Sequence, residues 1–245
     1  MVRRWLEVVQ SPRTFCLGSD IADHASPGQT VGVGPPSEQT VLKLFATPVV
    51  IATMPDTATL NAELRRLILA REKATESMER SNLGGWQSSW DMHEWGGAPM
   101  HKVLTFARNI VDDFTVDRSG KQHKIAWRIN SWANVNRYGD ANCFHTHPGA
   151  LWSSCYYVDD GGVGADSSFG GEFEIADPRG AATVMYAPQL TFPGPDGVAL
   201  GEAQRITPQA GMIVVFPSWL SHGVRTYHGT RVRISVPINF SIAGV

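Results

Sequence analysis

The sequence has few cysteines, few charged residues and no long apolar run, and each shortage excludes a class of protein. Its three cysteines, Cys16, Cys143 and Cys155, are scattered without CxxC spacing, which indicates neither a disulfide framework nor a zinc ribbon. The longest apolar stretch of the N-terminal half, residues 44–54, is much shorter than the roughly 20 residues that span a membrane. The first residues also lack the apolar segment of a secretory signal. We therefore expect a globular protein of the cytoplasm, without a membrane segment.

An excess of positive charge is also lacking. The 245 residues include 21 basic and 23 acidic side chains, which gives a formal net charge of -2. Proteins that bind nucleic acid or anionic lipid normally carry a basic surface, so neither partner is indicated. We expect the substrate to be a small molecule or a protein. The sequence leaves the oligomeric state open, with a homodimer as one option.

The first part of the chain differs in composition from the rest. Residues 1–40 are rich in Pro, Gly, Ser and Thr and show no apolar periodicity. Such a segment buries too little apolar surface to offset the entropy lost on ordering, so we predict a flexible N-terminal tail. Residues 41–245 are long enough for a sizeable core, and we predict that they form a single domain.

Two apolar stripes predict helices that flank a sheet. One stripe has three- and four-residue spacing from Leu60 to Ile68 and predicts a helix over about 57–80, with Asp56 or Thr57 as its cap. The other predicts a helix over about 99–116, entered through Pro99.

A tryptophan-rich segment lies between these predicted helices. Residues 84–97 contain three tryptophans between two glycine pairs, a pattern that fits no regular element. We predict a lid or a pocket wall here. A loop held by buried indole rings is an equally good interpretation.

The second half of the chain has the texture of an all-β structure. Over residues 125–243, short runs rich in β-branched and aromatic residues are bounded by Gly, Pro and Asp, and predict about six to eight strands. One of these runs is AATVMYAP, residues 181–188. Because no helical crossover pattern separates the runs, they favour a jelly roll or barrel over a parallel sheet. The predicted class is mainly β with flanking helices, that is, α+β.

Three histidines carry the clearest chemical signal. His145 and His147 are two residues apart, and in a strand that spacing places both imidazoles on one face. His222 follows the apolar run GMIVVFP and supplies a third imidazole. Three such ligands on one side of an ion leave open positions opposite, as oxygen-activating iron(II) requires and as hydrolytic zinc would also use. The histidines without such partners are expected at the surface or at caps: His93, His101, His123 and His228.

An alternating run downstream predicts an anion site. Arg231, Arg233 and Ser235 share one face of a predicted strand. An arginine inside a barrel needs an anion, and the fork of Arg233 can hold a carboxylate while the Ser235 hydroxyl adds a hydrogen bond. For Arg231, a solvated strand edge is the alternative. Tyr157 is expected to point into the barrel near this site or to be a core aromatic.

Four segments together resemble a known family. WANVNRYGDANCFHTHPGALWSSCYYV, GGEFEIADP, GMIVVFPSWLSHGV and RISVPINF are similar to the bacterial and phage 2-oxoglutarate- and iron(II)-dependent oxygenases that carry an HxHP motif. The resemblance runs from about Leu42 to the C-terminus. It implies a double-stranded β-helix core of the jelly-roll, cupin-like type. It also implies iron(II) held by His145 and His222, and 2-oxoglutarate whose far carboxylate is held by Arg233 and Ser235.

The resemblance has one departure, at position 147. The wider superfamily usually has Asp or Glu there, where this chain has His147. Two sites therefore remain open: a three-histidine site, which we favour, or one in which a histidine only supports the others. In the second, a carboxylate completes the site, with Glu172, Glu174 and Asp177 as candidates.

The function that the resemblance implies is a dioxygenase. It would oxidise an unidentified substrate, as a hydroxylase does, while 2-oxoglutarate is decarboxylated to succinate. No catalytic residue beyond the metal ligands is expected, and Tyr157 is an additional candidate contact for the cosubstrate. The alternatives are a cupin-like three-histidine enzyme that does not use 2-oxoglutarate, and a non-catalytic metal- or ligand-binding barrel. The Arg-x-Ser pair argues against the barrel, because a structural metal site is normally closed by four ligands.

Overall fold

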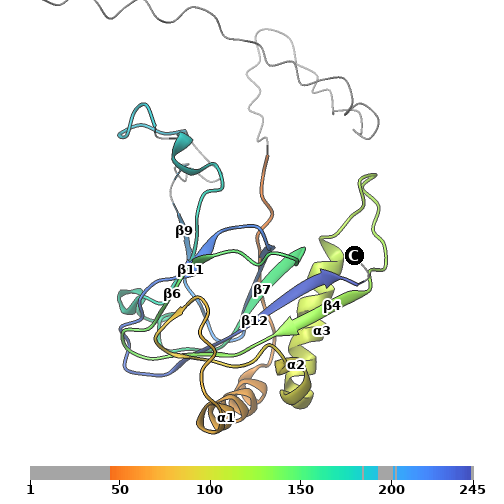
Figure 1. Cartoon of the computed structure of the whole chain (residues 1–245), viewed down its shortest axis with the longest axis vertical. Helices are drawn as coiled ribbons and strands as arrows, with labels where there is room; N and C mark the ends of the chain where they lie inside the picture. The colour runs from red at the N-terminus through yellow and green to blue at the C-terminus, as the bar shows by residue number, and fades with distance from the viewer. Residues whose placement is uncertain (1–44, 184, 193–200, 202, 244–245) are drawn as a thin grey trace, which may run out of the picture. The chain divides into compact units, whose positions relative to one another are not determined.

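The described strands form two antiparallel sheets. A computed structural model describes residues 45–183, 185–192, 201 and 203–243 (Figure 1). The helices are α1 (Ala58–Ala74), α2 (Met92–Trp95) and α3 (Gly97–Asp113), with 3-10 turns at Ser167–Phe169 and Gly180–Thr183. The strands are β1 (Val50–Thr53), β2 (Asn82–Leu83), β3 (Trp86–Gln87), β4 (Trp127–Ser131), β5 (Asn134–Asn136), β6 (Ala141–His145), β7 (Trp152–Asp160), β8 (Phe173–Ile175), β9 (Gln204–Ile206), β10 (Met212–Pro217), β11 (His222–Val224) and β12 (Arg233–Ile242).

The larger sheet is built around its two longest strands. Its seven strands run in the order β1-β10-β7-β12-β5-β3, and β4 pairs with β12 beside β5. The smaller sheet has the order β2-β6-β11-β8-β9. Apolar side chains of β7 and β10 pack against those of β8, so the two sheets face each other across a shared interior. This is the arrangement of a jelly roll.

Helices α1 and α3 cover the outer face of the larger sheet (Figure 1). Leu60, Leu64 and Ile68 are buried at four-residue spacing on α1, so one side of that helix faces the sheet. The strands contribute the opposite half of this core by period-two alternation. Their fully buried members are Val135, Tyr156, Ile213, Val215, Ile234, Val236, Ile238 and Phe240.

The helix predictions are confirmed in position, but not at their ends. Helix α1 ends at Ala74 instead of near residue 80, because Thr75 is extended, with φ -137° and ψ 149°. Thr57 occupies the N-cap position but makes no side-chain cap bond. Helix α3 begins at Gly97, which has a φ of +62°, and so includes Pro99 in its first turn.

Two other predictions about regular structure were wrong. The 84–97 segment is partly regular, since it contains β3 and the short helix α2. The run at 181–188 begins in the 3-10 turn Gly180–Thr183, and no strand is present in its described residues. The preceding strand, β8, pairs with β9 on one edge and β11 on the other, so the run adds no strand beside β8.

The strand region otherwise agrees with the prediction. Strands β4 to β12 lie between residues 127 and 242, and they number nine in the described chain, more than the expected six to eight. Three of them have only three residues on the smaller sheet, too short for a clear periodic signal. The predicted tail lies outside the described residues, and the single domain over 41–245 stays a prediction. No described helix is long and apolar enough to cross a membrane.

Candidate metal centre

The three predicted histidines come together at one end of the interior. His145 is the last residue of β6 and His222 the first of β11, and the two are direct partners across the strands. His147 lies two residues beyond the end of β6, where its main-chain N–H donates to the Ser218 carbonyl at 3.0 Å. The candidate ligand atoms of the three histidines lie within 4.8 Å of one another. Of the two histidines that were predicted to share one face of a strand, only His145 lies in a strand. His147 is positioned by the loop after β6.

Hydrogen bonds orient two of the imidazoles. Nδ1 of His145 lies 2.8 Å from the Cys143 carbonyl, and Nδ1 of His222 lies 2.8 Å from the Leu220 carbonyl. A carbonyl oxygen only accepts, so each Nδ1 carries the proton. Each Nε2 then carries a lone pair that a metal ion can take, and Nε2 of His222 lies 3.2 Å from Nε2 of His147. This is the tautomer that a metal-binding histidine needs.

Burial keeps the three imidazoles neutral. It lowers the pKa of His145, and it lowers the pKa of His147 to about 4 with a further contribution from the neighbouring His145. Burial, assisted by the charge of His145, lowers the pKa of His222 to about 3. At neutral pH the cluster therefore offers lone pairs that no proton has to leave.

No carboxylate joins the histidines in the described part of the chain. The three acidic candidates pair with arginines instead: Glu172 with Arg225 at 3.4 Å, Glu174 with Arg205 at 3.0 Å, and Asp177 with Arg179 at 2.7 Å. Three neutral imidazoles with open positions suit iron(II) or zinc by donor type. The donor set thus fits the metal that the resemblance implies.

The second predicted cluster contains a buried cation that no described carboxylate pairs with. Arg233 is 0% exposed, and its Nη1 donates to Asn136 Oδ1 at 3.1 Å. Its Nε and Nη2 are buried and have no hydrogen-bond partner among the described residues. A buried guanidinium with two unfilled donors is costly unless an anion binds there. A carboxylate would fill both donors.

Tyr157 and Ser235 adjoin this arginine. Ser235 is the cross-strand partner of Tyr157, and both are buried. The guanidinium carbon of Arg233 lies 5.4 Å from the centre of the Tyr157 ring. Burial raises the pKa of Tyr157 well above its usual range, so the hydroxyl keeps its proton and can donate. The structure thus brings all three predicted cosubstrate contacts into one place.

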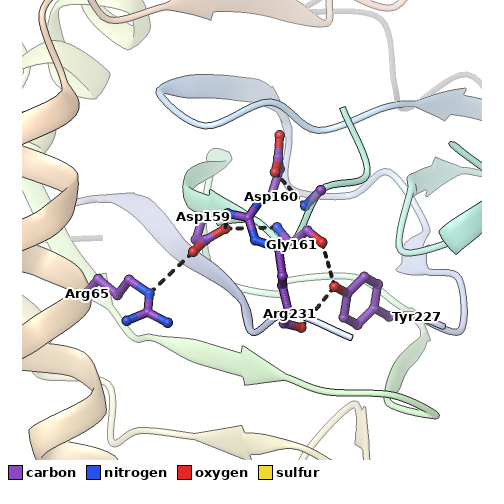
Figure 2. A network of polar contacts seen from close by, with 7 residues as sticks. Arg65, Asp159, Asp160, Gly161, Tyr227 and Arg231 are labelled. Atoms are coloured by element: carbon purple, nitrogen blue, oxygen red, sulfur yellow. Dashed lines mark hydrogen bonds and ion pairs between the residues drawn. The ribbon is translucent and has the colours of Figure 1, made fainter. Parts of the chain in front are cut away.

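Arg231 lies outside this cluster. Its side chain is 64% exposed, and its Nη2 lies 3.2 Å from a carboxylate oxygen of Asp159, whose other oxygen pairs with Arg65 of α1 at 3.3 Å (Figure 2). The Tyr227 hydroxyl lies 2.7 Å from the Gly161 carbonyl and 2.9 Å from that of Arg231, and helps to hold the turn after β7. The solvated-edge interpretation is the right one, because β12 begins at Arg233 and strand alternation does not extend to position 231.

A cavity of about 660 Å³ opens beside the histidines. Its wall includes Trp90 and Trp132, whose ring centres are 6.2 Å apart, and the Trp132 ring is 5.5 Å from that of His147. Asn130 and Asn239 also line it. Part of the tryptophan-rich segment is therefore a pocket wall, as predicted. Its other two tryptophans belong to the core cluster instead: Trp86 and Trp95.

Sequence reasoning missed three residues of this cavity wall. Asn130, Trp132 and Asn239 line the cavity but were not singled out from the sequence. Strand alternation could have identified Asn239. It lies four residues after Ser235 on the same strand, so its side chain points to the same face as those of Arg233 and Ser235.

One family and several solved structures match the chain. Residues 130–239 match the family described as "Putative 2OG-Fe(II) oxygenase". No curated protein sequence matches. A prolyl-4-hydroxylase from Pseudomonas putida has a TM-score of 0.54 and 18% identity, over 81% of this chain and 94% of that one. The viral collagen prolyl hydroxylase of Paramecium Bursaria Chlorella virus-1, as its 2OG complex, has a TM-score of 0.52 and 11% identity, over 80% of this chain and 96% of that one. HygX from Streptomyces hygroscopicus, with nickel, 2-oxoglutarate and hygromycin B bound, has a TM-score of 0.54 and 9% identity, over 81% of this chain and 84% of that one.

These matches test the resemblance drawn from sequence motifs. The structural matches confirm the mainly β, jelly-roll architecture. The family match confirms an iron(II)- and 2-oxoglutarate-dependent oxygenase domain. At 18% identity or less, the solved structures establish the fold only, so their substrates do not transfer to this chain.

Proposed function

Because residues 130–239 form a 2OG-Fe(II) oxygenase domain, we propose that His145, His147 and His222 hold its iron(II) and that Arg233, Ser235 and Tyr157 hold its 2-oxoglutarate. One observation carries the proposal: Arg233, buried on the interior face of β12, has two donor nitrogens without a partner in the part of the chain that the structure describes. A non-catalytic metal site would have no use for such a buried cation.

The residues divide the work between holding and orienting. When bound, iron(II) and 2-oxoglutarate supply the oxidising chemistry, in which dioxygen is consumed, succinate is formed and the substrate is oxidised. The imidazoles stay neutral, since burial lowers the pKa of each, so each has one lone pair to offer a metal ion. Arg233 neutralises the far carboxylate and fixes its direction by two parallel hydrogen bonds. Ser235 and Tyr157 add hydroxyl donors beside it.

The neutral donor set strengthens the case for an anionic cosubstrate. Three imidazoles leave the double positive charge of the ion uncompensated, whereas a carboxylate ligand would remove one unit of it. A dianion that binds between the ion and Arg233 compensates both charges at once. Until such a ligand is bound, the positive charges of the ion and of Arg233 have no negative charge beside them in the described interior of the jelly roll.

We place the substrate in the cavity beside His147, against Trp90 and Trp132. Aromatic walls exclude water and hold the reacting carbon near the metal centre. The near-neutral charge of the chain favours a small molecule or a protein side chain over nucleic acid. The scattered cysteines favour action in the cytoplasm.

The decisive experiment is an anaerobic titration of the metal-free protein with iron(II) and then 2-oxoglutarate, followed by the visible charge-transfer band of the chelate. Arg233→Ala should need at least about 100-fold more cosubstrate, because two charge-assisted hydrogen bonds are lost. Arg231→Ala is the matched control, because that arginine is exposed and pairs with Asp159, and it should titrate like the wild type. If the wild type binds iron but shows no band at any 2-oxoglutarate concentration, the cosubstrate assignment fails. The three-histidine enzyme without 2-oxoglutarate then becomes the better interpretation.

A further inference from the structure

His147 differs from the other two histidines in what faces its outer nitrogen. His145 and His222 each direct Nδ1 at a main-chain carbonyl two residues earlier in the chain. Nδ1 of His147 lies instead 3.4 Å from the side-chain amide nitrogen of Asn239. One histidine of the three is therefore oriented by a side chain, which can be mutated without changing the main chain.

Asn239 is itself firmly placed. It lies on β12, is 9% exposed, and has Ser153 of β7 and Asn130 of β4 as its cross-strand partners. The Ser153 hydroxyl donates to its amide oxygen at 2.8 Å. Two strands and one hydrogen bond thus fix the position of this amide next to His147.

Metal binding sets a requirement on this contact. A histidine that binds a metal through Nε2 keeps its proton on Nδ1, so the outer nitrogen becomes a donor. An amide N–H facing that donor would repel it. A half-turn of the Asn239 amide removes the conflict: the oxygen then accepts from His147 Nδ1–H, and the amide nitrogen donates to the Ser153 hydroxyl, which can accept.

We infer that Asn239 is a positioning residue for His147, which aligns the imidazole for the metal through its amide oxygen. The inference rests on the proposed metal centre. It explains how His147 is held although it lies beyond the last residue of β6. Partners of this kind typically change metal affinity by about 10- to 100-fold when they are removed.

The test uses cobalt(II) as a spectroscopic probe in the full chain, so that no turnover is required. Asn239→Ala should weaken cobalt(II) binding about 10- to 100-fold. Asn239→Asp should restore wild-type affinity or exceed it, because a carboxylate accepts the Nδ1–H in a charge-assisted bond. Asn130→Ala is the matched control: the residue lies opposite Asn239 in the same cavity wall and makes no hydrogen bond to a histidine in the described structure. It should leave cobalt affinity unchanged.

A second readout separates positioning from folding. In the cobalt(II) form, the Nδ1–H protons of bound histidines give paramagnetically shifted NMR signals that exchange with water. Three such signals are expected in the wild type, and the one from His147 should broaden or vanish in Asn239→Ala and return in Asn239→Asp. Unchanged affinity and an unchanged signal in Asn239→Ala would overturn the inference, as would a failure of the aspartate to rescue. If the wild type itself binds no cobalt(II), the metal centre and hence the proposed function fail instead.

Discussion

The two faces of strand β12 bury side chains of opposite character. On the helix side, Ile234, Val236, Ile238 and Phe240 are all fully buried in one apolar cluster. On the interior side, the intervening positions include Arg233, Ser235 and Asn239, which are polar and also buried.

The contrast separates stability from binding within one strand. The outer face is saturated, because apolar groups need only contact and packing. The inner face holds a cation with unfilled donors and belongs to an interior with depressed histidine pKa values. The polar groups of such a face find their partners in bound ligands. Substitutions on the outer face should therefore lower stability, whereas substitutions on the inner face should weaken ligand binding.

The largest effect is expected from a truncation on the outer face. Phe240→Ala leaves a cavity beneath the helices and should lower the free energy of unfolding by about 3–5 kcal/mol. Urea unfolding measures this loss. Metal affinity of the folded fraction should stay at the wild-type value, and a parallel loss of affinity would contradict the separation of the two faces.

A smaller effect is expected from acid, and it should come from the interior. In the metal-free protein, the folded pKa values of about 3 for His222 and about 4 for His147 lie below the usual value near 6.5. The unfolded chain therefore binds more protons, and stability is full above pH 6.5 and falls as the pH drops toward 4. Urea midpoints between pH 7 and pH 5 measure the slope. His222→Gln should flatten it, and an equal slope in that variant would show that other groups cause it.

Removing the interior cation should stabilise the ligand-free protein. Arg233→Met replaces a buried guanidinium with two unfilled donors by an apolar side chain, and should raise the free energy of unfolding by about 1 kcal/mol. The same variant should lose the response to 2-oxoglutarate. A destabilised Arg233→Met protein would mean that the arginine serves the fold as well as the ligand.

An effect of similar size tests a polar exception on the outer face. Tyr156 packs in the apolar cluster, and its hydroxyl donates to Asn61 at 2.7 Å. Tyr156→Phe should cost about 1 kcal/mol at neutral pH. Burial raises the pKa of Tyr156 to about 12, so wild-type stability should fall as pH rises above 10, and the variant should lose that contribution. Equal alkaline slopes in both proteins would contradict this assignment.

The same contrast explains what the sequence could predict. Period-two alternation correctly grouped Arg233 with Ser235, and extending it by four residues would have reached Asn239. It failed for Arg231, which precedes the strand, and it does not account for His147, which follows one. Alternation describes residues only while the chain is extended, and strand ends are set by partners elsewhere in the fold.

Local propensity was reliable where packing agreed with it. The apolar stripe from Leu60 to Ile68 is the buried side of α1. The helix ends at Ala74 because the backbone of Thr75 is extended. The strand-like composition of residues 181–188 did not produce a strand in the part described, where β8 pairs with β9 and β11 instead. Which edges are free is a property of the whole sheet, and no short segment encodes it.

Because His145 and His222 are cross-strand partners, the metal site forms only when β6 and β11 pair in the correct register. A slip of one residue between β6 and β11 would turn one imidazole to the outside while leaving most of the jelly roll intact. Such a molecule would pass for native by circular dichroism or size, yet it could not take up the metal. The fraction of a preparation that binds cobalt(II) therefore counts the molecules in which these two short strands paired correctly.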